Sequence, residues 1–235
     1  MNTSGMPQAH ITECMTGEQT PLTETVARAL QTATRREGKL GPPLLAMPGA
    51  SGQLYRYFIN NLVQYLPDAR YLEVGSWTGS TMCAAIFGNT LRAFAIDDWS
   101  EFGGPSGLFL QHVGQCMSKD IQFSMLSQDF RRVNYSAIGK FNVYLFDGPH
   151  EEQDQHDGLF LAQEALDDEF VFIVDDWNWD RVRAGTKRAI SSIKLEVLHG
   201  YEILTSLDGK PPPVGMEQSE WHNGYLLSVL RKPNS

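Results

Sequence analysis

The fold is decided by the stretch Tyr71-Leu-Glu-Val-Gly-Ser-Trp-Thr-Gly-Ser80, which lies near the first third of this 235-residue chain. Its apolar beginning predicts a buried β-strand. Gly75 and Gly79 follow that strand directly, and a helical stretch begins near Ser80. Glycine lets the backbone turn tightly and approach a ligand, and the N-terminus of the following helix offers unpaired N–H groups. The spacing differs from the G-x-G-x-x-G of dinucleotide-binding folds.

Short apolar runs alternate with helical segments after Pro67, which is typical of a parallel sheet covered by helices on both faces. We predict seven strands, at residues 71–74, 93–96, 122–126, 143–146, 170–174, 201–205 and 225–231. The connection from Leu207 to Asn223 contains Pro and Gly and is too short for a crossover helix, so the last strand should be antiparallel. The predicted fold class is therefore α/β, with a Rossmann-like, mostly parallel seven-stranded sheet.

Residues 1–50 are predicted to form an N-terminal arm and an accessory helix, and residues 51–235 the main domain. The first 20 residues or so have no apolar periodicity, so we expect an arm that is either loose or ordered by a partner. Helical spacing of apolar residues predicts one helix from Leu22 to Arg36 and a second from Gly52 to Leu66. The loop from Leu207 to His222 is placed to form a lid or a contact between copies in a homo-oligomer.

Composition excludes several classes of function. The net charge is −9 and the pI about 5.1, which disfavours a nucleic-acid partner because phosphate backbones are bound by clustered Lys and Arg. No apolar run approaches the roughly 20 residues of a membrane span, and no secretory signal is visible, so we expect a cytoplasmic protein without a membrane partner. Cys14, Cys83 and Cys116 have none of the spacings of a disulfide framework or zinc site, and we expect reduced thiols.

A carboxylate follows the second strand of the predicted sheet. Asp97 lies where a side chain can accept hydrogen bonds from both hydroxyls of a ribose, as in dinucleotide folds. Together with Glu73-Val-Gly75-Ser-Trp-Thr-Gly79, it makes the chain resemble the class I S-adenosylmethionine (SAM) methyltransferases. That resemblance covers roughly residues 50–231. The cofactor-binding residues that it implies are Glu73, Gly75, Ser76, Thr78, Gly79, Asp97, Trp99, Gln128 and Asp129. Trp99 is equally explained by simple packing.

Acidic residues also follow the fourth and fifth predicted strands. Asp147 and His150 follow the fourth strand, and Asp175 and Asp176 follow the fifth. The carboxyl ends of parallel strands converge above the ligand crevice, where three carboxylates would repel one another unless a cation or protonation relieved them. Mg²⁺ prefers oxygen ligands of this kind. We therefore expect a magnesium site, although strand-end acids also occur as solvated groups or helix caps.

The carboxylate pattern is similar to that of the metal-dependent, macrocin-type O-methyltransferases, which modify sugars and secondary metabolites. The resemblance implies that Asp147, Asp175 and Asp176 bind Mg²⁺, and that His150 acts as the base, with Asp147 as the other candidate. The methyl group would then pass directly from SAM to a hydroxyl of a small molecule such as a sugar or polyketide. The chain departs from other members in having Pro149 directly before His150.

Other functions stay open at this point. The enzyme could be a metal-independent methyltransferase in which His150 alone is the base, or the chain could bind SAM without catalysis. An NAD-linked enzyme is disfavoured because the third glycine is missing and the last strand is reversed. Arg181, Arg183, Lys187 and Arg188 could meet an anionic substrate, but ordinary pairing along a helix explains them as well.

Overall fold

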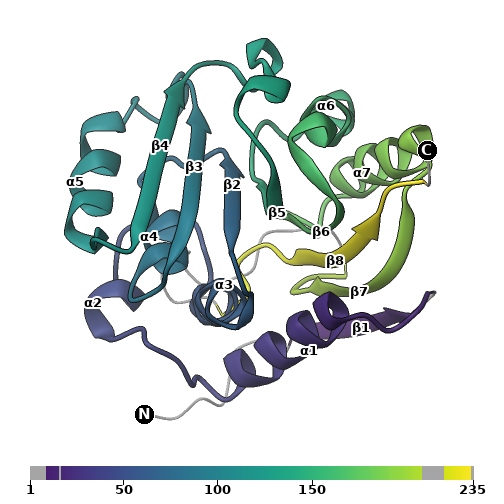
Figure 1. Cartoon of the computed structure of the whole chain (residues 1–235), viewed down its shortest axis with the longest axis horizontal. Coiled ribbons are helices and arrows are strands. Elements are labelled where there is room, and N and C mark those ends of the chain that lie inside the picture. The colour runs from purple at the N-terminus through teal and green to yellow at the C-terminus, as the bar shows by residue number, and fades with distance from the viewer. Residues whose placement is uncertain (1–8, 16, 208–219, 234–235) are drawn as a thin grey trace.

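A computed structural model describes residues 9–15, 17–207 and 220–233, and within them eight strands form one sheet (Figure 1). The strands are β1 (His10–Met15), β2 (Arg70–Val74), β3 (Leu91–Asp97), β4 (Ile121–Ser127), β5 (Phe141–Phe146), β6 (Leu166–Val174), β7 (Glu196–Leu204) and β8 (Tyr225–Arg231). Their order across the sheet is β1-β7-β8-β6-β5-β2-β3-β4. This confirms the predicted α/β class and each of the seven predicted strands, and it adds an eighth.

The helices of the described residues are α1 (Pro21–Thr34), α2 (Pro42–Leu45), α3 (Gln53–Tyr65), α4 (Ser80–Ile86), α5 (Ser106–Cys116), α6 (Glu152–Ala162) and α7 (Asp180–Ile193). Three short 3₁₀ turns, η1 (Phe130–Arg132), η2 (Tyr135–Ala137) and η3 (Gln163–Ala165), lie in the connections. Helix α1 begins where Thr20 and Thr23 form a reciprocal capping box, with Pro21 at the first helical position. Both helices predicted ahead of the sheet are therefore present.

The sheet has a parallel part and an antiparallel part. Strand β2 pairs in parallel with β3 and β5, β3 pairs with β4, and β5 pairs with β6. Strand β8 is antiparallel to both β6 and β7, as the short connection after β7 predicts. The carboxyl ends of β2, β3, β5 and β6 consequently lie at one edge, next to the amino end of β8.

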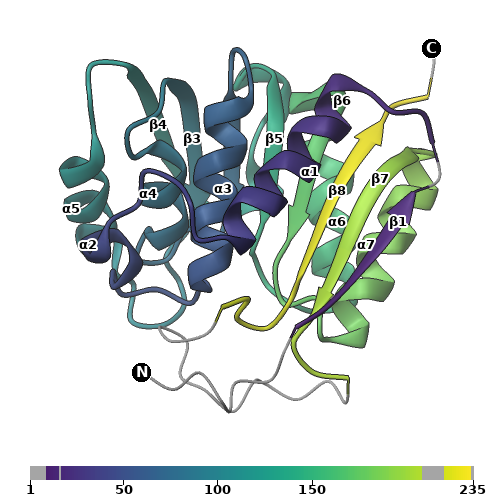
Figure 2. The ribbon, with the colours of Figure 1, turned by 90° about the horizontal axis from the view of Figure 1, so that it is seen from below.

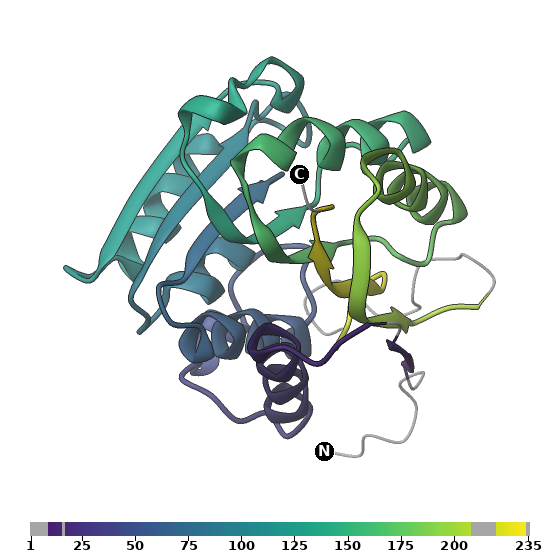
Figure 3. The same ribbon diagram turned by 45° about the vertical axis from the view of Figure 1, so that its right-hand side comes forward.

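The expected loose arm is wrong for residues 10–15. His10–Met15 forms β1, which pairs antiparallel with β7 and becomes the edge of the sheet (Figure 3). The side chains from His10 to Glu13 are exposed, so the sequence carries no apolar alternation there. Backbone pairing to the otherwise open edge of β7 holds this strand, and such pairing leaves no mark in the hydrophobic pattern.

Helices cover both faces of the sheet, which is why its central strands are apolar throughout (Figure 2). On β6, Val171 and Ile173 belong to the core that the sheet shares with α1, α3, α4 and α5. Phe170 and Phe172 face the opposite way, into the core shared with α6 and α7. The two layers fix the sheet edge on which the loops after the strands gather.

Two further expectations concern the predicted lid and the absence of a membrane span. Most of the proposed lid at residues 207–222 lies outside the described residues, which resume at Glu220. Among the helices that the structure describes, none is long and apolar enough to cross a membrane.

Candidate functional site

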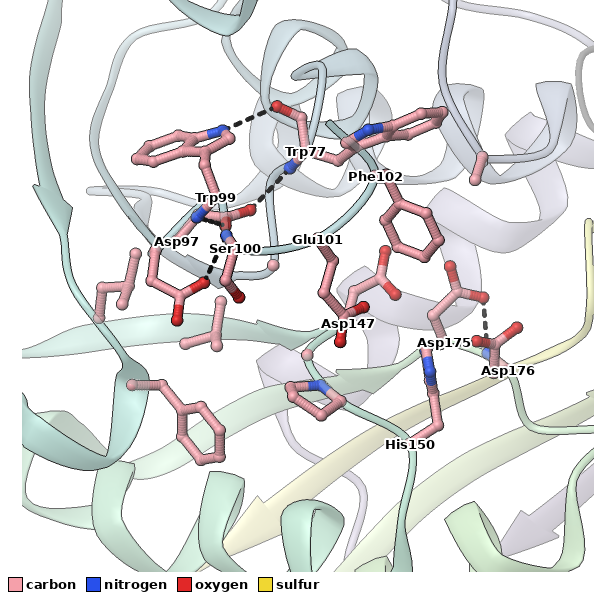
Figure 4. A pocket seen from close by; sticks show the side chains of 18 of the residues that line it. Trp77, Asp97, Trp99, Ser100, Glu101, Phe102, Asp147, His150, Asp175 and Asp176 are labelled. Carbon is pink, nitrogen blue, oxygen red and sulfur yellow. Dashed lines mark hydrogen bonds and ion pairs between the residues drawn. The ribbon is translucent and has the colours of Figure 1, made fainter. Parts of the chain in front are cut away.

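A cavity of about 400 Å³ opens at the carboxyl ends of β2, β3, β5 and β6. Its volume falls within the range of sites that hold small ligands and cofactors. Gly75, Asp97 and Trp99 line one part of it, and His150 and Asp176 line another (Figure 4). The two groups of residues predicted from the sequence thus share one cavity.

The glycine loop (residues 75–79) needs its two glycines for a steric reason. Gly75 has φ +84° and Gly79 has φ +87°, a region that side chains rarely adopt. A methyl group at Gly75 would overlap the backbone carbonyl of Asp147, and one at Gly79 would lie 2.9 Å from the Phe109 ring. The first glycine therefore lets the loop after β2 pack against the loop after β5, and so joins the two halves of the cavity.

Hydrogen bonds hold the glycine loop in place. Asp97 Oδ2 accepts from the backbone N–H groups of Ser76 and Trp77, both at 2.8 Å. Asp97 Oδ1 accepts from the N–H of Trp99 at 2.7 Å, and the Trp99 indole N–H donates to the carbonyl of Trp77. His112 Nδ1 lies 2.7 Å from the carbonyl oxygen of Thr78. Asp97 thus has two roles: its carboxylate holds the glycine loop in place, and it also lines the cavity.

The residues expected to bind the cofactor fall into two groups. Those that line the cavity are Gly75, Asp97, Trp99, Gln128 and Asp129. Those that lie behind its wall are Glu73, Ser76, Thr78 and Gly79. Trp99 is only 8% exposed and packs on Phe109, so packing accounts for most of its surface. Thr78 holds the loop through a hydrogen bond from Oγ1 to the Pro48 carbonyl.

Glu73 is fully buried under the glycine loop. Its carboxylate accepts a hydrogen bond from the Tyr71 hydroxyl. Burial raises the pKa of Glu73 to about 7, although the bond from Tyr71 works in the opposite direction. The structure thus gives Glu73 an interior position, one layer below the cavity.

The carboxylate half of the site brings three side chains together. Ligand atoms of Asp147, His150 and Asp176 all lie within 4.8 Å of one another, and His150 Nε2 is 2.7 Å from Asp176 Oδ2. Asp175, expected as a third metal ligand, lines the same cavity but is not in this convergent group (Figure 4). Its Oδ1 accepts from the backbone N–H of Asp176 at 2.6 Å.

Burial and mutual repulsion set the charge of these acids. Burial raises the pKa of Asp147 well above its ordinary value, and the charges of Asp175 and Asp176 add to the effect. Burial and the charge of Asp176 likewise raise the pKa of Asp175. For Asp176, burial works upward, but the close approach of His150 and the hydrogen bond from Asn223 outweigh it and the pKa is lowered. Asp176 is the carboxylate that remains ionised beside His150.

Among the cavity residues that were not predicted from the sequence, two lie next to the carboxylates. His222 and Asn223 come from the segment just before β8, and Asn223 Nδ2 donates to Asp176 Oδ1 at 2.6 Å. Burial lowers the pKa of His222. The antiparallel course of β8 brings this segment to the site edge. The predicted reversal of the last strand was the available signal, since no motif marks these positions.

The basic residues of α7 are paired with acids. Arg181, Lys187 and Arg188 lie 3.7, 3.4 and 2.9 Å from carboxylates of Glu151, Glu202 and Glu152, and Arg183 pairs with Asp180. Ordinary pairing therefore accounts for these cations. Among the cavity-lining residues that the structure describes, Arg131 is the one Lys or Arg, and it pairs with Asp154 and Asp157.

The donor groups fit a nucleoside cofactor and a divalent ion. Gly75 leaves backbone open to the cavity, and Asp97 has carboxylate lone pairs beyond the three N–H groups it already accepts. Two carboxylates and an imidazole within reach of one another suit a divalent metal. The arrangement can therefore hold both groups next to each other.

Comparisons with known proteins agree on the fold. No family model and no curated protein matches the chain in sequence. TrmN from Thermus thermophilus has a TM-score of 0.55 and 17% identity, over 81% of this chain and 52% of that chain. SMU.776, a methyltransferase candidate solved with SAH, has a TM-score of 0.53 and 14% identity, over 78% and 50%. PH1948 from Pyrococcus horikoshii, a candidate RNA methyltransferase, has a TM-score of 0.52 and 12% identity, over 92% and 100%.

The chain spans about half the length of the first two of these proteins. With the strand order and the reversed β8, the likeness shows a Rossmann-like methyltransferase fold.

Proposed function

We propose that this protein is a SAM-dependent methyltransferase that methylates a hydroxyl oxygen of a small molecule, assisted by a divalent metal ion. One observation carries the proposal: Asp147, His150 and Asp176 converge in the cavity that Gly75 and Asp97 also line. A methyl donor and an activated hydroxyl must lie side by side for transfer, and this cavity has groups suited to each.

The residues proposed to bind the cofactor line the cavity where the loops after β2, β3 and β4 meet it. Asp97 is placed to accept from ribose hydroxyls, and Gln128 and Asp129 line the end where an adenine would lie. The neighbour SMU.776 was solved with SAH, the product that SAM leaves after methyl transfer. The same cofactor in this chain would leave its sulfur near the carboxylate half.

Asp147 and Asp176 are the proposed metal ligands, with Asp175 next to them, and Mg²⁺ is the first candidate. Such an ion lowers the pKa of a bound hydroxyl and fixes its orientation. Asp176 orients His150, which takes the acceptor proton as general base, and Asp147 is the alternative base. The transfer is a direct displacement from sulfur to oxygen, so the chain needs no covalent nucleophile.

A small molecule is the favoured acceptor because the cavity is acidic. Asp98, Glu101 and Asp129 line it in addition to the carboxylates above, and Arg131 is already paired. A polyanionic acceptor such as nucleic acid would be repelled by these charges. Neutral polyols, sugars and polyketides would not.

A second candidate function is metal-independent methylation. It is favoured by the 2.7 Å contact between His150 and Asp176, which resembles a base and its orienting carboxylate. In this case, Asp147 would orient the acceptor hydroxyl.

Formation of SAH from SAM tests the proposal, with a panel of hydroxylated sugars, polyketides and phenols as acceptors. We expect turnover that chelation by EDTA abolishes and that Mg²⁺ or Mn²⁺ restores. Turnover unaffected by EDTA would select the metal-independent function. Calorimetric SAM binding without turnover of any acceptor would indicate a non-catalytic SAM-binding protein, and the absence of SAM binding would refute both proposals.

A further inference from the structure

Strand β4 forms one edge of the sheet. It pairs in parallel with β3 over all seven of its residues, and among the described parts of the chain no strand pairs with its other side (Figure 1). The backbone N–H and C=O groups that point outward from such an edge need water or another strand as partners. Gln122 and Ser124 expose their side chains along this strand. The edge can therefore receive a further strand.

The sequence of β4 lacks the features that usually prevent such pairing. Edge strands are commonly protected by charged side chains, proline or bulges. Residues 121–128 read Ile-Gln-Phe-Ser-Met-Leu-Ser-Gln, with no charge and no proline, and the register between β3 and β4 has no shift. The opposite edge, β1, is one residue shorter and carries the exposed, charged Glu13. Of the two edges, β4 is thus the one suited to strand pairing.

Helix α5 lies on the same side of the molecule as β4 and extends the uncharged surface (Figures 1 and 2). Residues 106–118 contain no Asp, Glu, Lys or Arg. Phe109 faces inward, where its ring lies 6.2 Å from that of Phe123 on β4. Leu110 and Met117 face outward and are 50% and 40% exposed. Two exposed apolar side chains one heptad apart lie on one face of a helix, so an apolar strip runs beside the open edge.

The charge of the protein favours a second copy of this chain as the occupant. The net charge is −9, so two copies repel each other over most of their surfaces, and an uncharged face is where they can meet. Antiparallel pairing of two identical strands about a two-fold axis satisfies the outward groups of both. Lys119 and Asp129 each lie five residues from Ser124, so pairing centred on Ser124 sets the lysine of one copy opposite the aspartate of the other.

We infer that the protein forms a two-fold symmetric dimer through β4, with the outward face of α5 flanking the paired strands. The sheets of the two copies then form one continuous sheet across the interface. This contact is independent of the proposed chemistry, because it uses the backbone of an edge strand and an uncharged helix face.

A pair of matched substitutions tests the inference. Ser124→Lys places two lysines next to each other at the two-fold axis, and Thr12→Lys places a lysine at the exposed hydroxyl residue of the β1 edge. Both change the net charge by the same amount. Sedimentation velocity over a range of protein concentrations should show a dimer of the 26.3 kDa chain. Ser124→Lys should weaken this dimer about 100-fold or more, and Thr12→Lys should leave it within about twofold.

Two further measurements keep the test independent of how well Ser124→Lys folds, which circular dichroism checks. Leu110→Glu, on the outward face of α5, should also weaken the dimer, by about tenfold or more. In the unaltered protein, hydrogen exchange of the amides in residues 121–127 should slow about tenfold or more as the dimer forms.

A monomer at every concentration would overturn the inference. So would a dimer that folded Ser124→Lys leaves intact, or one that Thr12→Lys weakens as strongly. Unchanged exchange in β4 on dimer formation would place the interface elsewhere and would overturn the inference as well.

Discussion

His150 Nε2 lies 2.7 Å from Asp176 Oδ2, and Asn223 holds the other oxygen of the same carboxylate at 2.6 Å. The Asp176 carboxylate is therefore oriented from two sides, by one loop after β5 and by the segment before β8. A carboxylate fixed in this way can orient a base or complete a metal site without reorganising during the reaction.

Asp176→Asn should therefore be more damaging than Asp175→Asn. Asp176 belongs to the convergent group with His150, whereas Asp175 does not. We expect Asp176→Asn to lower kcat roughly 100-fold or more, and Asp175→Asn to lower it less than about tenfold. Both should bind SAH within about threefold of the unaltered protein. Steady-state kinetics and calorimetry measure the two quantities, and a larger loss in Asp175→Asn would place the key carboxylate at that position instead.

Gly75→Ala should destabilise the fold, because its φ is +84° and the new methyl group would overlap the Asp147 carbonyl. We expect the free energy of unfolding in urea to fall by about 2 to 4 kcal/mol. Gly114→Ala is the matched control: it lies in α5 with open space around it, and should raise the free energy of unfolding by about 0.5 to 1 kcal/mol. Equal effects of the two changes would contradict the close approach of the two loops.

Glu73→Gln should change how stability depends on pH. The folded pKa of about 7 exceeds the ordinary value of 4.5, so the folded state retains a proton that the unfolded chain releases between these values. The free energy of unfolding should therefore fall as pH rises from about 4.5 to about 7, by about 3 kcal/mol from this group, and not change further above it.

Removing the carboxyl group removes that contribution. Urea unfolding at pH 5 and pH 8 should show a smaller loss of stability in Glu73→Gln than in the unaltered protein. The other buried acids are present in both proteins, so the difference between them reports on the Glu73 carboxyl together with its charge coupling to Asp147. Parallel pH curves for the two proteins would show that the Glu73 carboxyl ionises normally.

Asp97→Asn should loosen the glycine loop. Asp97 accepts three backbone N–H groups, and an amide NH₂ in place of one oxygen would face a donor instead of accepting from it. Hydrogen exchange followed by mass spectrometry should show the amides of Ser76 and Trp77 exchanging about tenfold faster or more. Asp98→Asn is the control, because the exposed Asp98 accepts from the backbone N–H of Ser100, which lies outside the glycine loop. Unchanged exchange in Asp97→Asn would mean that other contacts hold the loop.

Most of the fold could be predicted because buried strands and helices show a recognisable pattern of apolar residues in the sequence. The run from Phe170 to Val174 is buried on both faces of the sheet and is apolar at every position, so its strand was evident. Strand β1 was not predictable in this way, because its stability comes from backbone pairing with β7 while most of its side chains face solvent.

The site could be predicted only up to the sheet edge at which its residues gather. Asp147, His150, Asp175 and Asp176 were placed there from strand ends alone. Which of them converge depends on side-chain directions and local backbone, such as the φ of +57° at Asp176, that no spacing reveals.

The insertion of β8 between β6 and β7 has a consequence for how this protein could be altered. The part of the cavity proposed to hold the cofactor is built by the loops after β2, β3 and β4, whereas His222 and Asn223 come from the segment that leads into the antiparallel strand β8. If the proposed function holds, acceptor choice and cofactor choice would be encoded in separate stretches of chain. Changing the residues just before β8 would then alter which acceptors bind, while the sequence of the proposed methyl-donor site stays the same.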